Sequence, residues 1–152
     1  NANSFSLPAG NGIIVACVLI SIVAIAGAVV VSILVTRPLK TIEETVDLFC
    51  EKFLKCFDEC VTDLMAKTPG FKEYYLDSIL SDTAAYAGTE LIRRTVGMAN
   101  VKDVTTIADE AKRAHAEKVN ILCGKDYIMN RTAFKTGADF VAAVKRADEA
   151  AK

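Results

Sequence analysis

The chain has 152 residues, 52% of them hydrophobic and 24% charged, and its 18 basic and 19 acidic side chains leave a net charge of −1. A strongly basic surface is the usual mark of a nucleic-acid-binding protein, so this balance argues against a nucleic-acid partner. The five cysteines are an odd number at irregular spacing, which favours reduced thiols over a disulfide framework.

Residues 13–35 form an uncharged run of 23 residues in which nothing is more polar than Ser21 and Ser32. At about 1.5 Å per residue, a helix of this length spans about 34 Å, which is enough to cross a bilayer. A secretory signal peptide would need a basic start and an apolar core of about 7–15 residues. Because residues 1–12 carry no basic residue, the sequence predicts a retained transmembrane helix.

The charges beside this run predict its orientation, because basic residues stay on the side from which the chain is inserted. Arg37 and Lys40 follow the run, and nothing basic precedes it. We therefore expect a short lumenal or intermembrane stub over residues 1–12 and a linker over residues 36–40. A helical domain over residues 41–152 should lie on the stromal, matrix or cytoplasmic side.

One face of the expected membrane helix carries small side chains, which would let another helix approach closely. This face consists of Ser21, Ala24, Ala28 and Ser32, and Gly27 widens it. The same spacing also arises by chance in alanine-rich anchors, so both interpretations stay open. The run contains no His, Asp, Glu, Asn or Gln, so no side-chain ligand for a pigment or haem is expected and no intrinsic cofactor is predicted.

The first helix of the domain is predicted over residues 41–67, because its apolar residues recur every three or four positions. These residues are Ile42, Val46, Phe49, Phe53, Phe57, Cys60 and Leu64. The sequence Thr68-Pro69-Gly70 should end this helix. A second helix is predicted over residues 72–96, ending near Gly97, with Tyr75, Ile79, Ala85, Leu91 and Ile92 as its core residues.

A third helix is predicted over residues 106–127, with a break at either Cys123-Gly124 or Asn130-Arg131. A last helix over residues 136–151 should bury Phe140, Val141 and Val144. Strand-like alternation is absent from the sequence. The predicted fold class is therefore all-α, with one transmembrane helix followed by a small bundle of four to five helices.

Residues 70–144 carry a resemblance that is most specific in AYAGTELIRRTVGMANVKDVTTIAD, residues 85–109, and that continues through Arg113, Glu117, Gly124, Asn130 and Arg131. This stretch resembles the C-terminal end of methylthioribose kinase, a small-molecule kinase of methionine salvage. The resemblance covers about half of the chain in one register. It implies that the domain corresponds to the last helices of the larger lobe of a two-lobed kinase.

In that family the paired arginines help hold the sugar near the transferred phosphate, so the resemblance implies a ligand-binding role for Arg93 and Arg94. Adjacent helical residues point about 100° apart, so at most one of the two can face a pocket. The simpler expectation is that they pair with carboxylates such as Glu90, Asp103 or Asp109, or contact a partner or a lipid phosphate. The nucleotide loop, phosphate-binding lysine and catalytic carboxylates of a kinase are missing from the sequence, so we expect no enzyme and no catalytic residues.

Two further groups of residues are interpreted as structural. Cys50, Cys56 and Cys60 share one helix, but a closed zinc site would need His115 or Cys123 as a fourth ligand. We therefore expect no metal, and interpret these cysteines as small core residues. His115 lacks the surroundings of a catalytic loop and is expected to be an ordinary helix residue.

Together these features predict a non-catalytic accessory subunit of a larger membrane complex, bound to core subunits and lipids. Asn1 in place of Met indicates a removed targeting segment, which favours an organelle: a thylakoid photosystem ahead of a mitochondrial inner-membrane respiratory complex. Two alternatives stay open. The chain could be a membrane-tethered sensor of a sugar or sugar phosphate, or part of a split methylthioribose-type kinase.

Overall fold

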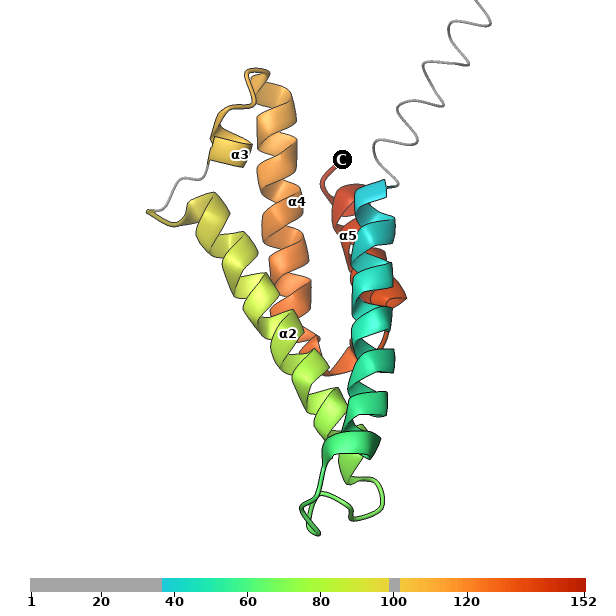
Figure 1. Ribbon diagram of the computed structural model, residues 1–152. Helices are drawn as coiled ribbons and strands as arrows, with labels where there is room; N and C mark the ends of the chain where they lie inside the picture. Colours follow the sequence, from blue (N-terminus) through green and yellow to red (C-terminus); the bar gives the residue numbers. More distant parts are fainter. Residues whose placement is uncertain (1–36, 99–101) are drawn as a thin grey trace, which may run out of the picture. The chain divides into compact units, whose positions relative to one another are not determined.

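The computed structural model describes residues 37–98 and 102–152. The chain divides into two units between Leu39 and Lys40, and the fold below is that of the second unit. The elements of the described residues are a helix over residues 37–60, which begins just before this unit, α2 (Phe71–Val96), α3 (Lys102–Thr105), α4 (Glu110–Met129), the 3-10 turn η1 (Arg131–Ala133) and α5 (Gly137–Ala150), as Figure 1 shows. The described residues contain no strand, which confirms the all-α prediction for this part of the chain.

The first predicted helix ends earlier than expected, at Cys60 rather than near Lys67. Its last backbone bond runs from the Val61 amide to the Phe57 carbonyl at 3.1 Å. Just beyond, the Asp63 carboxylate accepts a bond from the Met65 amide at 2.8 Å, a local turn that competes with continued helix. Gly70, with φ of +83°, then turns the chain into α2.

The third predicted helix begins later than expected, because Asp109 caps its first turn. The Asp109 carboxylate accepts a bond from the Lys112 amide at 3.1 Å. α4 then runs without a break through Cys123 and Gly124 and ends before Asn130. Of the two predicted breaks, the one at Asn130 is confirmed and the one at Cys123-Gly124 is wrong.

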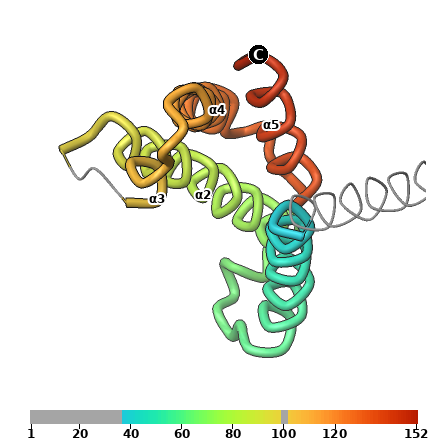
Figure 2. Tube along the Cα trace, turned by 90° about the horizontal axis from the view of Figure 1, so that it is seen from above, coloured from blue at the N-terminus to red at the C-terminus, as the bar shows by residue number. Residues whose placement is uncertain are grey.

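The core forms where α4 contacts both α2 and α5 (Figure 2). Gly88 of α2 and Gly124 of α4 meet there so closely that a Cβ atom on Gly88 would lie 2.6 Å from the Gly124 carbonyl oxygen. The buried residues of α2 are Leu80, Ala84 and Gly88, and the last two are small enough to allow this close approach. The larger residue Tyr75, predicted as core, is 46% exposed.

The α5 end of the core matches the prediction more closely. Phe140 and Val141 are buried, and Val144 packs against the core cluster. Tyr127 and Phe134 complete an aromatic centre with Phe140, with ring centroids 4.9–5.4 Å apart. This centre fixes the turn between α4 and α5.

The helix over residues 37–60 joins the bundle at two places. The first is the start of α5, where the Gly137 amide donates to the Asp47 carboxylate at 2.8 Å and a Cβ on Gly137 would lie 2.3 Å from the Glu43 carbonyl oxygen. The second is a row of aromatic rings that connects this helix to α2, with centroids 5.7–6.4 Å apart. We call this row the aromatic ridge; it consists of Phe49, Phe53, Phe57, Phe71 and Tyr75.

The predicted transmembrane helix is contradicted. Within residues 37–98 and 102–152, no helix has both the length and the apolar character needed to cross a bilayer, because the longest ones carry several charged side chains. The predicted span, residues 13–35, and its small-sided face of Ser21, Ala24, Ala28 and Ser32 lie outside the described residues. The described residues therefore give no support to the predicted localisation as an integral single-pass membrane protein.

Candidate functional site

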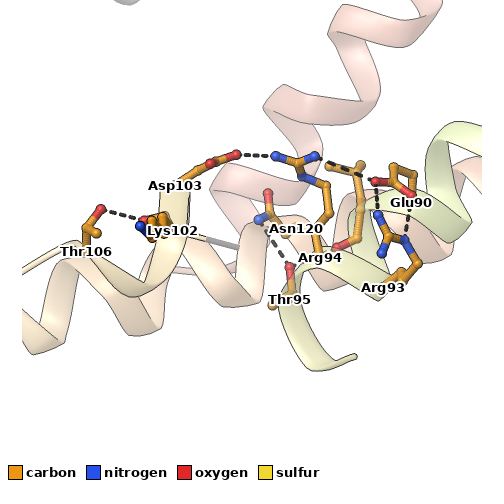
Figure 3. A network of polar contacts seen from close by, with 9 residues as sticks. Glu90, Arg93, Arg94, Thr95, Lys102, Asp103, Thr106 and Asn120 are labelled. Atoms are coloured by element: carbon orange, nitrogen blue, oxygen red, sulfur yellow. Dashed lines mark hydrogen bonds and ion pairs between the residues drawn. The ribbon is translucent and has the colours of Figure 1, made fainter. Parts of the chain in front are cut away.

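Arg93 and Arg94 lie in the last turn of α2 (Figure 3). Basic side chains are stabilised at a helix C-terminus, because the unpaired carbonyl groups there carry partial negative charge. Gly97 follows, and its amide donates to the Arg93 carbonyl at 3.0 Å, which closes the helix where the sequence predicted. The local structure thus places both arginines at the C-terminal end of α2.

The two arginines point to different carboxylates. Arg93 donates from Nε and Nη2 to the two carboxylate oxygens of Glu90, at 2.8 and 2.6 Å. Arg94 donates to Asp103 on α3, and lies 3.6 Å from a Glu90 oxygen. Two of the three predicted carboxylate partners are therefore confirmed, while Asp109 caps α4 instead.

This network is balanced in charge and open to solvent. Hydrogen bonding from Arg93 lowers the pKa of Glu90, and hydrogen bonding from Arg94 lowers the pKa of Asp103. Both carboxylates are therefore ionised at neutral pH, and their charges offset those of the two arginines. Exposed ion pairs of this kind contribute little to stability, because water and salt screen them.

The network adjoins a groove that the sequence reasoning missed. The Asn120 amide of α4 donates to Thr95 Oγ1 of α2 at 3.2 Å, beside Arg94 (Figure 3). Asn120 and Glu90 also line a groove of about 420 Å³ that is otherwise mostly apolar. Its lining comes from four separate helices, so no local sequence pattern could have marked it.

The remaining candidate residues do not form a site around the arginines. Within the described ranges, no group of three or more His, Cys, Asp and Glu side chains is placed to hold a metal. Cys56 and Cys60 are exposed rather than core residues, and Cys123 is buried in the bundle. His115 is half-buried and pairs with Asp148 of α5 at 2.9 Å, which links α4 to α5.

Comparison with known proteins gives partial matches to several methylthioribose kinases. The methylthioribose kinase of Yersinia enterocolitica is 30% identical over 108 residues, which are 71% of this chain and 27% of that protein. The methylthioribose kinase of Bacillus pumilus is 34% identical over 94 residues, 62% of this chain and 24% of the kinase. The methylthioribose kinase of Erwinia tasmaniensis is 40% identical over 81 residues, which are 53% of this chain and 20% of that protein. No protein-family model matches the chain.

These matches correct the expectation that the chain is not an enzyme. That expectation came from kinase parts missing from the sequence, yet the chain spans only about a quarter of the length of the curated relatives it matches. Parts missing from one quarter of a protein carry no information about its remainder. The relatives are named as kinases, which are enzymes.

The matches also agree with the resemblance that residues 85–109 carry, and with a fragment from the C-terminal part of such a kinase. We conclude that this chain is related to the methylthioribose kinases over about a quarter of their length.

Proposed function

We propose that this helical unit is the C-terminal part of a methylthioribose-kinase-type phosphotransferase. In this proposal it works packed against the polypeptide that corresponds to the remaining three quarters of its relatives. The observation that supports it most is the match in sequence to several methylthioribose kinases. Whether that polypeptide belongs to the same chain or to a second one does not change the proposed role.

The aromatic ridge supports a protein contact. Phe49 is 43% exposed, Phe71 36% and Tyr75 46%, although all three contact other rings of the ridge. Contiguous apolar surface on a folded domain typically marks an interaction site. In the proposed role, the ridge is the surface on which the rest of the kinase-like fold packs.

Arg93 and Arg94 have a specific task in this proposal, which is to contact the substrate or its transferred phosphate. Guanidinium groups bind phosphate and hydroxyl oxygens through paired N–H donors. Their present carboxylate partners are exposed and weakly bound, so a bound substrate could replace one of them. Asp103 would then be released from Arg94, and the ion pair between α2 and α3 would be lost.

Association with a truncated relative tests this role. The Yersinia enterocolitica kinase would be produced without the segment that aligns with this chain, and mixed with the 152-residue chain. We expect a one-to-one complex in analytical ultracentrifugation. Tyr75→Ser should weaken it at least about tenfold, because the ridge loses a ring that is desolvated on binding. Tyr86→Ser is the matched control on the same helix, since Tyr86 is 76% exposed and outside the ridge.

A second candidate follows from the ridge alone. The unit could be an accessory subunit of a larger protein assembly that is unrelated to kinases, with the ridge as its contact surface. Purification of the native assembly and mass spectrometry distinguish the two candidates. A partner resembling the rest of a methylthioribose kinase favours the first, and core subunits of another complex favour the second.

The third candidate is a small-molecule sensor, in which Arg93 and Arg94 would bind the ligand without the rest of a kinase. The isolated chain would have to bind methylthioribose or a sugar phosphate by itself. A rise in melting temperature with either compound, lost in Arg94→Ala, would support it.

A further inference from the structure

The groove beside the arginine network opens directly onto the hydrophobic core. Its volume of about 420 Å³ lies between the helix over residues 37–60, α2, α4 and α5. Val46, Ala87, Val119 and Val144 contribute one side chain from each of these helices. Such a volume falls within the range of small-molecule sites, about 300–1,000 Å³.

Buried residues line the groove as well as partly buried ones. Cys123, Tyr127 and Phe140 belong to the core cluster and also line the groove. Protein interiors are normally packed without spaces of this size, because lining atoms without neighbours lose dispersion contacts. An apolar occupant would restore those contacts and remove this part of the core from water.

The polar groups of the groove are already bonded within the chain. The Tyr127 hydroxyl donates to the Phe140 carbonyl at 3.1 Å, and the Thr83 hydroxyl donates to the Ile79 carbonyl at 2.8 Å. The Asn120 amide donates to Thr95. A polar ligand would therefore have to compete with bonds that already exist.

The charges beside the groove also cancel. Glu90 and Asp103 carry two negative charges, and Arg93 and Arg94 carry the two positive charges that bind them. A charged group placed in the apolar part of the groove, which Arg93 and Arg94 do not line, would lose its hydration without an opposite charge beside it, which is unfavourable. Charge complementarity thus selects a neutral occupant.

We propose that this groove is a binding site for an uncharged, apolar small molecule. The inference concerns a site separate from the arginines, so it does not depend on the kinase-like role.

A pair of fluorescent probes tests the charge preference on the 152-residue chain. N-phenyl-1-naphthylamine is uncharged and fluoresces in apolar sites, and 1-anilinonaphthalene-8-sulfonate is the same ring system with a negative charge. We expect one site for the neutral probe, and binding at least about tenfold weaker for the sulfonate because its charge must be desolvated. Equal affinities, or tighter binding of the sulfonate, would overturn the proposal.

A substitution that fills the groove tests the location. Ala87→Leu places three more carbon atoms in the groove, and should weaken the neutral probe at least about tenfold by excluding it. Ala114→Leu adds the same atoms on an exposed part of α4 and should leave binding unchanged. If Ala87→Leu binds as well as the unaltered chain, the probe lies elsewhere, for example on the aromatic ridge, and the proposal is wrong.

A measurement without any substitution guards against a folding defect in Ala87→Leu. Cys123 lines the groove, and the exposed Cys56 and Cys60 serve as internal references. Peptide mass spectrometry would follow the alkylation of each cysteine. A saturating amount of the neutral probe should slow alkylation of Cys123 several-fold and leave the alkylation rates of the two reference cysteines unchanged. Binding of the probe without protection of Cys123 would also overturn the proposal.

Discussion

Gly88 determines how closely α2 and α4 can approach each other. A Cβ there would lie 2.6 Å from the Gly124 carbonyl oxygen and 2.8 Å from Ile128 Cγ1. The first of these atoms is backbone, so it cannot move aside without shifting α4. The intrinsic helix preference of alanine over glycine is about 1 kcal/mol, which is too small to offset such overlap.

We therefore predict that Gly88→Ala lowers the free energy of unfolding by about 1–3 kcal/mol, the usual effect of overpacking. Urea unfolding followed by circular dichroism measures the change. Thr89→Ala, the next residue and an exposed one, should change stability by less than about 0.5 kcal/mol. Equal effects of the two substitutions would show that the helices do not meet at Gly88.

Tyr127 gives stability a dependence on alkaline pH. Burial raises the pKa of Tyr127 well above its ordinary value of 10.0. The protonated hydroxyl is therefore favoured by the fold, and the stabilisation is complete below pH 10 and lost as the pH rises above it.

Tyr127→Phe should remove this dependence while lowering stability at neutral pH by about 1 kcal/mol, the net value of the hydrogen bond to Phe140. Unfolding in urea between pH 8 and pH 11 compares the two proteins. Tyr86→Phe, at an exposed position, should keep the dependence of the unaltered chain. Parallel pH curves for Tyr127→Phe and the unaltered chain would contradict a buried hydroxyl.

At the scale of the elements, helix ends follow from short-range chemistry that the sequence displays. Thr136 and Asp139 form a reciprocal capping box at the start of α5, at the boundary predicted from the sequence. The predicted start of α4 was too early. Asp109 caps the N-terminus of the helix, so α4 begins at Glu110 although the apolar spacing extends further back along the chain. Periodicity alone locates a helix but not its first residue.

Asp139→Ala should lower the free energy of unfolding by about 1 kcal/mol through loss of the cap. Its carboxylate accepts bonds from the Thr136 and Lys135 amides at 2.8 and 3.0 Å. Thermal and urea unfolding measure the effect, with Glu149→Ala on the exposed side of α5 as the control. If Glu149→Ala lowers the free energy of unfolding as much as Asp139→Ala does, the effect comes from the loss of a negative charge and not from the loss of the cap.

For the whole molecule, the sequence predicted the helical class, and the arginine partners Glu90 and Asp103, because these depend on local spacing. The core face of α2 was predicted only in part: Leu91 packs against the core cluster as expected, but the apolar pattern favoured the exposed Tyr75 over the buried row that includes Ala84 and Gly88. That row is selected by close approach to Gly124, a distant residue whose position no local pattern reveals. The groove and the aromatic ridge likewise arise from helices far apart in sequence.

The enzyme and membrane predictions failed for a different physical reason. Both predictions treated one feature as decisive for the whole protein. The enzyme prediction depended on kinase parts that this sequence lacks, and the membrane prediction depended on an apolar run outside the described residues. The relationship to methylthioribose kinases depends instead on a long aligned stretch. We therefore expect that this stretch can serve as the corresponding part of such a kinase.

A grafted enzyme measures that claim most directly. The segment of the Yersinia enterocolitica kinase that aligns with this chain would be replaced by the matching residues of this chain, with the original segment regrafted as control. We predict ATP-dependent phosphorylation of methylthioribose by the graft, and a loss of at least about tenfold in kcat/KM, or about 1.4 kcal/mol, in the variant with both Arg93→Ala and Arg94→Ala. A folded graft without activity, beside an active control, would contradict the account.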